Sequence, residues 1–134
     1  MYIFDTDTLS NIVKSHPSSL LQRKLADLPP EFQHATSINA AEIYYGAYRS
    51  PSKERILKVF QDIVFSNLKV LPFDEHSALV YGHLRAKLEK RGPTKSEPDL
   101  RIAAIALQHK FILITGNTRH FREIPRLKTE NWIG

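Results

Sequence analysis

Four polar residues stand at points where the chain is expected to leave a strand or enter a helix. Asp5, Glu42 and Asn117 follow short strand-like segments, and Asp99 opens a strongly apolar helical segment. Because the carboxyl ends of parallel strands meet at one edge of a sheet, these side chains can converge there. Hard cations such as magnesium need oxygen ligands, and two or three carboxylates carry enough charge to hold one or two ions. Such a site suits phosphodiester hydrolysis, because the metal can activate water and offset charge developing on phosphate oxygens.

Two of these acids have a purely structural alternative. The segment from Asn39 to Glu42 fits a variant of the capping box, and the segment from Ser96 to Asp99 fits its standard form. Glu42 and Asp99 could therefore only satisfy backbone N–H groups in the first turn of a helix. Capping and metal binding are compatible roles, since a helix N-terminus also helps to keep a nearby carboxylate ionised.

Asp5 is harder to explain as structure alone. A carboxylate directly after a buried strand has little purpose there beyond capping the next helix, and Asp7 or Thr8 could do that equally well. Glu97 stands two residues before Asp99 and could join the acidic cluster or act as a solvated cap. Both interpretations of each acid stay open at this level.

Residue types that other active sites use are absent or scattered. The chain has no cysteine, which excludes disulfides, thiolate metal ligands and thiol nucleophiles. Its six histidines show no H-E-x-x-H or comparable spacing. His120 is the histidine nearest the expected site, and it is a candidate substrate contact together with Arg119 and Arg101.

The charge of the chain favours a polyanionic partner. Lys and Arg number 19 against 14 Asp and Glu, a formal net charge of +5. Each phosphate that Lys or Arg neutralises releases condensed counterions, although many basic proteins bind no nucleic acid. Two basic clusters are expected to flank the cleft and contact phosphates, or else to form solvated faces. They comprise Lys87, Lys90, Arg91 and Lys95, and Arg119, Arg122, Arg126 and Lys128.

Three tyrosines on one predicted helix, Tyr44, Tyr45 and Tyr48, have a similar pair of interpretations. Aromatic rings of this kind can stack on the bases of a nucleic acid. Their helical spacing favours packing in the core or in a dimer interface instead.

Short strands alternate with helices along the chain. Apolar runs and turn signals predict strands over Tyr2 to Phe4, Ala35 to Ile38, Lys69 to Pro72 and Phe111 to Thr115, with a last short strand within Leu127 to Trp132. Helical spacing predicts helices around Leu9 to Val13 and Leu20 to Leu25, from Asn39 to Tyr48, around Ile56 to Val64 and Ala78 to Leu88, and from Leu100 to Gln108. This alternation predicts an α/β fold, a three-layer α/β/α sandwich with a mostly parallel central sheet.

A length of 134 residues with 42% hydrophobic content suits a single domain over residues 1–134. There is no apolar stretch of roughly 18 residues to span a bilayer, and no segment resembling a signal peptide. We therefore expect a cytoplasmic protein with no membrane partner.

Four segments, taken together and in order, resemble a PIN domain of the VapC type. The resemblance extends to Tyr81–Arg85 and Glu130–Trp132, so it spans nearly the whole chain, and it is greatest to the subgroup described as tRNA-specific endonucleases. The segments are Tyr2–Ser10, Ser37–Gly46, Asp99–Ala104 and Thr115–Phe121.

The resemblance implies a toxin of a type II toxin–antitoxin system. It implies a metal-dependent endoribonuclease in which Asp5 and Asp99 match the Mg²⁺ ligands, Glu42 is the third acid and Asn117 completes the catalytic set. Mn²⁺ is expected to substitute for Mg²⁺. The expected partners are an RNA substrate such as tRNA, a cognate antitoxin protein and a second copy of the chain in a homodimer.

Two positions depart from the family pattern. Residue 7 is Asp where the family often has Asn or Ser, and residue 117 is Asn where many members carry a fourth acid. An amide oxygen can still ligate a metal or orient water, so activity is compatible with this change. Whether one or two ions act here stays open from sequence alone, and if a second ion is weakly held, Asn117→Asp is expected to tighten magnesium binding.

Two other functions compete with this one. The segment from Phe4 to Leu9 superficially resembles the D-x-D loop of haloacid-dehalogenase-like phosphatases, but Thr115 to Thr118 offers no acid where that family needs one. A non-catalytic PIN-like module that binds RNA or protein is the second alternative. The presence of Asp5, Glu42 and Asp99 argues against it.

Overall fold

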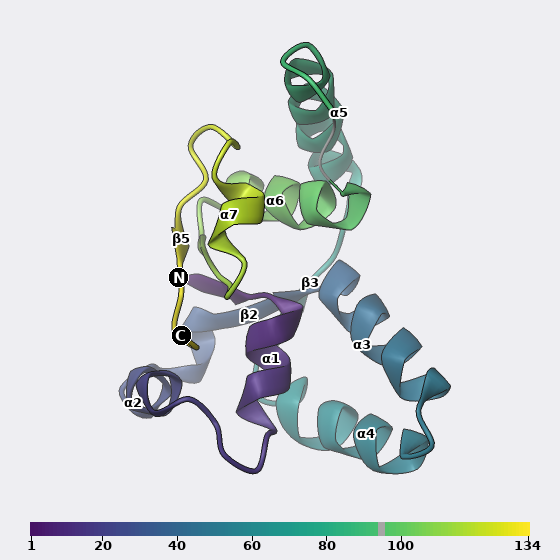
Figure 1. Cartoon of the computed structure of the whole chain (residues 1–134), viewed down its shortest axis with the longest axis vertical. Helices are drawn as coiled ribbons and strands as arrows, with labels where there is room; N and C mark the ends of the chain where they lie inside the picture. The colour runs from purple at the N-terminus through teal and green to yellow at the C-terminus, as the bar shows by residue number, and fades with distance from the viewer. Residues whose placement is uncertain (94–95) are drawn as a thin grey trace.

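Five parallel strands form one sheet in the order β3-β2-β1-β4-β5 (Figure 1). The computed structural model describes residues 1–93 and 96–134, so Lys95 of the first basic cluster lies outside the described residues. The strands are β1 Tyr2–Phe4, β2 Gln33–Thr36, β3 Lys69–Leu71, β4 Ile112–Ile114 and β5 Thr129–Glu130.

Helices connect the strands and cover both faces of the sheet (Figure 1). This arrangement confirms the predicted three-layer α/β/α sandwich. Its α-helices are α1 Thr6–Ile12, α2 Ser19–Ala26, α3 Ser37–Arg49, α4 Lys53–Val59, α5 Glu75–Glu89, α6 Glu97–His109 and α7 Thr118–Phe121. A 3₁₀ turn spans Pro30–Phe32, and a π-helical segment, Phe60–Val64, directly follows α4.

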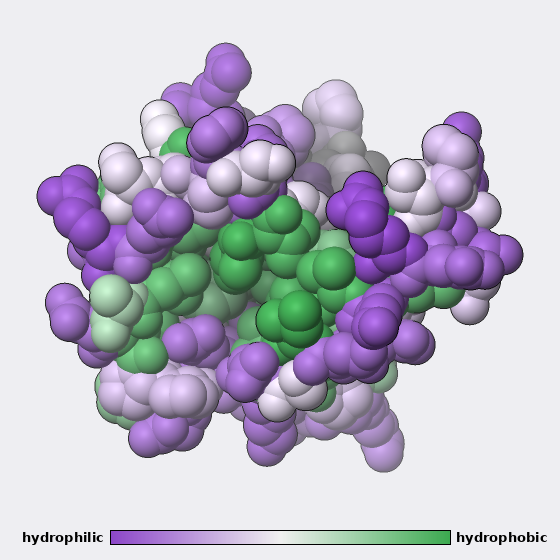
Figure 2. Space-filling view, turned by 90° about the horizontal axis from the view of Figure 1, so that it is seen from below, coloured by the Kyte–Doolittle hydropathy of each residue, from purple (hydrophilic) through white to green (hydrophobic). Residues whose placement is uncertain are grey.

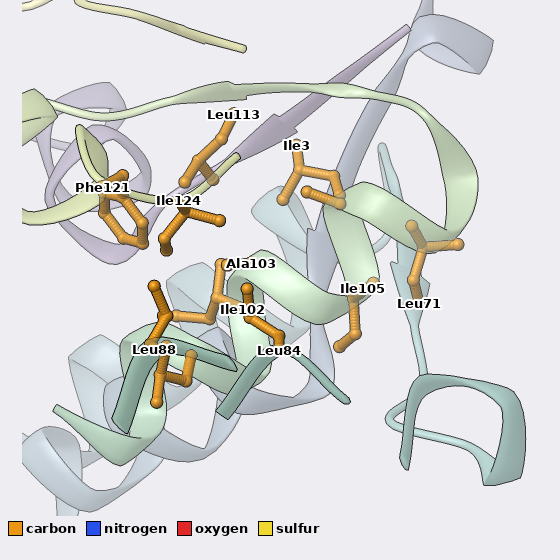
Figure 3. Close-up of a cluster of buried hydrophobic side chains, with 12 residues drawn as sticks. Ile3, Leu71, Leu84, Leu88, Ile102, Ala103, Ile105, Leu113, Phe121 and Ile124 are labelled. Atoms are coloured by element: carbon orange, nitrogen blue, oxygen red, sulfur yellow. The ribbon is translucent and has the colours of Figure 1, made fainter. Parts of the chain in front are cut away.

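Two hydrophobic cores lie on opposite faces of the sheet, because successive strand residues point to opposite sides. Ile3 and Leu113 face the first core, which α5 and α6 cover, and Figure 3 shows their side chains directed toward those helices. Phe4 and Ile114 face the second core, which includes residues of α1 to α4. The predicted apolar helix lies in the first core, where every residue from 102 to 106 is buried.

One predicted strand boundary is wrong. The second strand ends at Thr36, so Ser37 and Ile38 belong to α3 and not to the strand. The reason is a capping box in which the Thr36 side chain accepts from the backbone N–H of Asn39 and the Asn39 side chain accepts from the backbone N–H of Thr36. Glu42 therefore lies beyond the first turn of α3, and the capping role considered for it is wrong.

The two shortest helical elements were not predicted. Helix α7 and the turn at Pro30–Phe32 span only four and three residues, too few for a helical period to be visible in the sequence. Among the described residues, no helix has the length and apolar character needed to cross a membrane.

Candidate active site

Asp5 lies at the centre of the polar cluster, where the order of the strands reverses. Strand β1 pairs with β2 on one side and with β4 on the other, which is the position where α/β sheets bind ligands. Phe4 is in register with Ile114, so Asp5 and Thr115 leave the sheet side by side. Asp5 also caps α1 through its side chain, a role that the sequence left equally to Asp7 or Thr8.

Three hydrogen bonds hold the buried Asp5 carboxylate in one orientation. Its Oδ1 accepts from the backbone N–H of Thr6 at 2.8 Å and from Nδ2 of Asn39 at 3.0 Å, and its Oδ2 accepts from Oγ1 of Thr115 at 2.8 Å. Burial, together with the nearby charges of Asp7 and Asp99, nevertheless raises the pKa of Asp5 above its usual value. The site thus holds a carboxylate whose charge is only partly compensated by the protein.

Asn39 connects this carboxylate to α3. The residue is fully buried, its Oδ1 accepts from the N–H and hydroxyl of Thr36, and its Nδ2 donates to Asp5 and to Oγ1 of Thr6 at 3.1 Å. All the hydrogen-bonding groups of the amide are therefore in use. The sequence pattern indicated Asn39 only as part of a cap. Its spacing of three residues from Glu42 puts both on one helix face, and that signal could have identified it.

Glu42 and Asp99 lie within electrostatic reach of Asp5. Oε1 of Glu42 accepts from Oγ1 of Thr6 at 3.2 Å. Glu42 is exposed as a residue, but partial burial of its carboxyl group and the charges of Asp5 and Asp99 raise its pKa. Asp99 caps nothing with its own carboxylate in the described structure, because Ser96 provides the cap of α6. The Asp99 carboxylate lies 3.7 Å from Nδ1 of His120.

Asn117 and Asp7 lie beside this group and contact each other. Oδ2 of Asp7 accepts from the backbone N–H of Gly116 at 2.9 Å and from Nδ2 of Asn117 at 3.3 Å. The backbone N–H of Asn117 donates to Oγ1 of Thr115 at 3.0 Å. Asn117 occupies the N-cap position of α7 without a side-chain capping bond.

The donors at this edge have the chemistry of a hydrated hard-cation site. Within residues 1–93 and 96–134, no three acidic or histidine side chains form a ready cage for an ion. Magnesium, however, usually keeps several of its waters and is bound through one or two carboxylates. Asp5, Glu42 and Asp99 offer only oxygen ligands, and the charges of neighbouring acids raise the pKa of Asp5 and of Glu42, where a cation would lower it. The residues present therefore fit such an ion.

Comparison with known proteins identifies the family. A sequence profile of the PIN domain matches residues 2–127. The chain belongs to the PIN-domain family. It is 34% identical over 132 residues to "Ribonuclease VapC2" of Haemophilus influenzae, with 98% of both chains covered. It is 31% identical over 131 residues to "tRNA(fMet)-specific endonuclease VapC" of Salmonella typhimurium, covering 98% of this chain and 97% of that relative.

Solved structures agree with this family membership. The crystal structure of VapBC2 from Rickettsia felis, bound to a DNA fragment from their promoter, matches this PIN domain with a TM-score of 0.87. The two chains are 32% identical, and the match covers 98% of each. These similarities confirm the VapC-type PIN domain that the four sequence segments predicted.

The three candidate substrate contacts of the PIN domain differ in their surroundings. His120 and Arg119 are exposed on α7, next to Asp99. Arg101 instead packs between α6 and α5, with its guanidinium 5.3 Å from the ring centre of Phe73 and 5.5 Å from that of Tyr81, and it pairs with Glu97. Glu97 is therefore occupied by this ion pair, and Arg101 has a packing role.

The basic clusters do not both flank the cleft. Three of their members line a cavity with Lys110, and Lys128 directly precedes β5, so this cavity lies at the amino end of β5, opposite the acids. Among the described members, Arg119 lies on α7 and Arg122 follows directly at its C-terminal end, and α7 carries the His120 that lies near Asp99. The members that line the cavity are Lys87, Arg126 and Lys128.

The three tyrosines of α3 differ in their exposure to solvent. Tyr44 packs edge-on against Phe65 with the ring centres 5.7 Å apart, in agreement with core packing. Tyr45 and Tyr48 are 64% and 66% exposed, so a core role for these two is wrong. They remain available to a partner.

Proposed function

We propose that this PIN domain is the ribonuclease toxin of a toxin–antitoxin pair and that it hydrolyses RNA with Mg²⁺, for which Mn²⁺ substitutes. The observation that carries the proposal is the group of three acids, Asp5, Glu42 and Asp99, at the point where the strand order reverses. The relatives named as VapC ribonucleases support the RNA substrate and the nuclease activity.

Asp5 and Asp99 would hold the ion, with Glu42 as a third ligand or as the residue that orients water. Oδ2 of Asp5 accepts one hydrogen bond and keeps a second acceptor site, and Oε2 of Glu42 accepts none from the described residues. When bound, the ion supplies positive charge against the phosphate oxygens and activates water. The three hydrogen bonds on Asp5 keep its carboxylate in place, so little reorganisation is needed when RNA binds.

We assign tRNA as the substrate class, on the basis of the relative named as a tRNA(fMet)-specific endonuclease. The exposed Arg119 and His120 on α7 lie where they can contact a phosphate next to the acids. Because RNA is the substrate, we assign the activity to the cytoplasm. The proposed homodimer would use Tyr45 and Tyr48, which project large rings into solvent from α3.

The proposed antitoxin would bind the apolar surface below the sheet. Figure 2 shows a hydrophobic area bordered by hydrophilic residues on the face where α1, α2 and α4 lie in Figure 1. Ile12, Leu25, Ile56 and Val59, which are partly buried against the second core, belong to these helices. An apolar segment of the antitoxin can cover this surface and place Arg or Lys against the acids, as a cation would. The VapBC2 complex supports such a partner.

The test of the nuclease is cleavage of tRNA by the parent chain and by Asp5→Asn, Asp99→Asn and Glu42→Gln. The amides keep the shapes of the side chains while removing the charge that attracts the ion, so each variant of the two Asp residues should lose activity by about a hundredfold or more. Glu42→Gln should lose less. Asp27→Asn is a matched control. It removes the same single negative charge from an exposed acid at the C-terminal end of α2, outside the candidate site.

The products and the metal requirement separate the alternatives. Cleavage should stop with chelator and leave 5′-phosphate and 3′-hydroxyl ends, as expected for attack by water. A 2′,3′-cyclic phosphate would mean attack by the 2′-hydroxyl and would contradict the mechanism. Rapid cleavage by both Asp variants in metal-free buffer would overturn the proposed function. Hydrolysis of an aryl phosphate without RNA cleavage would favour the phosphatase.

A further inference from the structure

Asp7 is an acid of the site to which the proposed chemistry assigns no ligand role. Its Oδ2 is committed to the turn that follows β4, where it accepts from the backbone N–H of Gly116 at 2.9 Å and from Nδ2 of Asn117 at 3.3 Å. Its Oδ1 lies 3.2 Å from the Thr8 hydroxyl, whose single proton it shares with the carbonyl oxygen of Ile114 at 3.1 Å. The carboxylate therefore joins the first turn of α1 to a segment more than 100 residues away in sequence.

The turn closes tightly on this carboxylate. A Cβ atom at Gly116 would lie 2.8 Å from Oδ2 of Asp7 and 2.9 Å from Cδ1 of Ile133, closer than side chains approach one another. Glycine at position 116 thus permits the direct approach of the backbone N–H to Asp7. The contact is part of the architecture of the turn.

The contact also decides which atom of the Asn117 amide is left free. An ionised carboxylate only accepts hydrogen bonds, so the amide presents its NH₂ group to Asp7. Oδ1 then lies on the other side of the planar amide, and no described residue donates to it. Asn117 therefore keeps a neutral oxygen that is available as a ligand.

A second chain of bonds leads from the same turn to Asp5. The backbone N–H of Asn117 donates to Oγ1 of Thr115 at 3.0 Å, and that hydroxyl donates to Oδ2 of Asp5 at 2.8 Å. A threonine hydroxyl has a single proton. Because Asn117 supplies a donor to the oxygen, the hydroxyl proton is directed to the carboxylate.

We propose that Asp7 is a positioning residue that forms a carboxylate–amide hydrogen-bonded pair with Asn117. Its charge holds the turn, directs the Thr115 hydroxyl to Asp5 and leaves the amide oxygen of Asn117 free. The two positions that depart from the family pattern are thus partners, with the acid on α1 and the amide on the turn. The consequence for the ion rests on the proposed metal-dependent function, whereas the pairing itself does not.

The test is a double-mutant cycle of Asp7→Asn, Asn117→Asp and the exchange variant D7N/N117D. Melting temperature in chelator measures the pairing without metal or RNA, and titration calorimetry with MgCl₂ measures ion binding. Asp7→Ala is added because it removes the acceptor for Gly116, which Asp7→Asn keeps. Asp27→Asn is the matched control for loss of one exposed carboxylate.

Asn117→Asp alone should lower the melting temperature in chelator by about 3–6 °C, because it places two carboxylates where an N–H now donates. The exchange variant should recover part of this loss, because the neutral amide at position 7 ends the repulsion between two carboxylates while its oxygen still accepts from the Gly116 N–H. Asp7→Asn should change the melting temperature little but weaken Mg²⁺ binding about tenfold. Asp7→Ala should lower both the melting temperature and the affinity for Mg²⁺. The exchange variant should bind Mg²⁺ at least as well as the parent.

Additive effects would overturn the proposal: if Asn117→Asp costs the same in the parent and in the Asp7→Asn background, the two side chains do not interact. A loss with Asp7→Asn as large as with Asp7→Ala would also overturn it, because the role would then be only structural. If the chelator cycle is non-additive and no variant binds Mg²⁺, the pairing stands and the metal-dependent function fails.

Discussion

The two ends of the sheet carry opposite charges and are built in opposite ways. At the carboxyl end, buried and half-buried acids are held by hydrogen bonds from threonine, asparagine and backbone donors. At the amino end, four cations surround a cavity of about 550 Å³ with apolar residues in its walls, and among the described residues none of the four forms an ion pair. They are Lys87, Lys110, Arg126 and Lys128.

The backbone conformations at the two ends of the sheet differ as well. Lys110 and Arg126 have φ values of 60° and 67°, in the left-handed region that residues with a side chain seldom adopt. The acids instead occupy ordinary cap and helix positions. The comparison shows that the net charge of +5 says nothing of the sign of the site. Under the proposed function, RNA would meet acids at the carboxyl end, and a cation there would offset their charge.

The largest expected effect is on stability at the acidic end. Asn39→Ala removes the buried acceptor of the Thr36 N–H and hydroxyl and one of the three donors to Asp5, so the free energy of unfolding should fall by about 2–3 kcal/mol. Lys110→Gly is the counterpart at the basic end, and it should raise stability by up to about 1 kcal/mol by relieving the left-handed strain. Urea denaturation in chelator measures the free energy of unfolding of both variants. A change of the same sign and size in the two would refute the structural difference between the two ends of the sheet.

The next effect concerns pH. Burial, and after it nearby charges that include Asp99, raise the pKa of Asp5 and of Glu42. An acid whose pKa is higher in the folded than in the unfolded protein contributes stability that is fully present below the unfolded pKa. This contribution is lost as pH rises through the pKa of the folded state. Asp99→Asn should lower both pKa values and make the metal-free protein lose less stability over that window.

Urea denaturation of the parent and Asp99→Asn at about pH 4 to 8 in chelator measures this slope. NMR titration of the Asp5 and Glu42 carboxyl carbons supplies a direct control. Equal slopes and unchanged titrations in the two proteins would show that Asp99 does not act on its neighbours.

The smallest effect compares RNA contacts at the two ends. The double variant Arg119→Gln/Arg122→Gln should raise KM for tRNA about three- to tenfold at low salt, because both cations lie on or next to α7, whose His120 is near Asp99. Each lost phosphate contact should lower the salt dependence of binding by about one in slope. Lys87→Gln/Lys128→Gln removes equal charge at the far cavity and should change KM less than about twofold. A larger rise in KM for Lys87→Gln/Lys128→Gln than for Arg119→Gln/Arg122→Gln would place the RNA at the basic end of the sheet.

Much of the fold was predictable because it depends on local patterns. Apolar runs located the strands at Tyr2–Phe4 and Ile112–Ile114, and helical spacing located α5 and α6. The second strand was misplaced because Ala35 to Ile38 is uniformly compatible with extended backbone. The competing signal was the Thr36–Asn39 capping box, which begins the helix two residues earlier. Helix α7 was too short to show a period.

The sequence by itself determined the parallel α/β alternation, the family resemblance and the three acids of the candidate site. These follow from residue type, periodicity and ordered motifs, which do not depend on distant contacts. Only the tertiary structure decided that Asn39 and Thr115 hold Asp5, that Asp7 pairs with Asn117 and that Arg101 packs against rings. The hydrogen-bonded partners lie more than 30 residues apart and meet only after β1 pairs with β4 and α3 packs beside them, so no local pattern encodes these contacts.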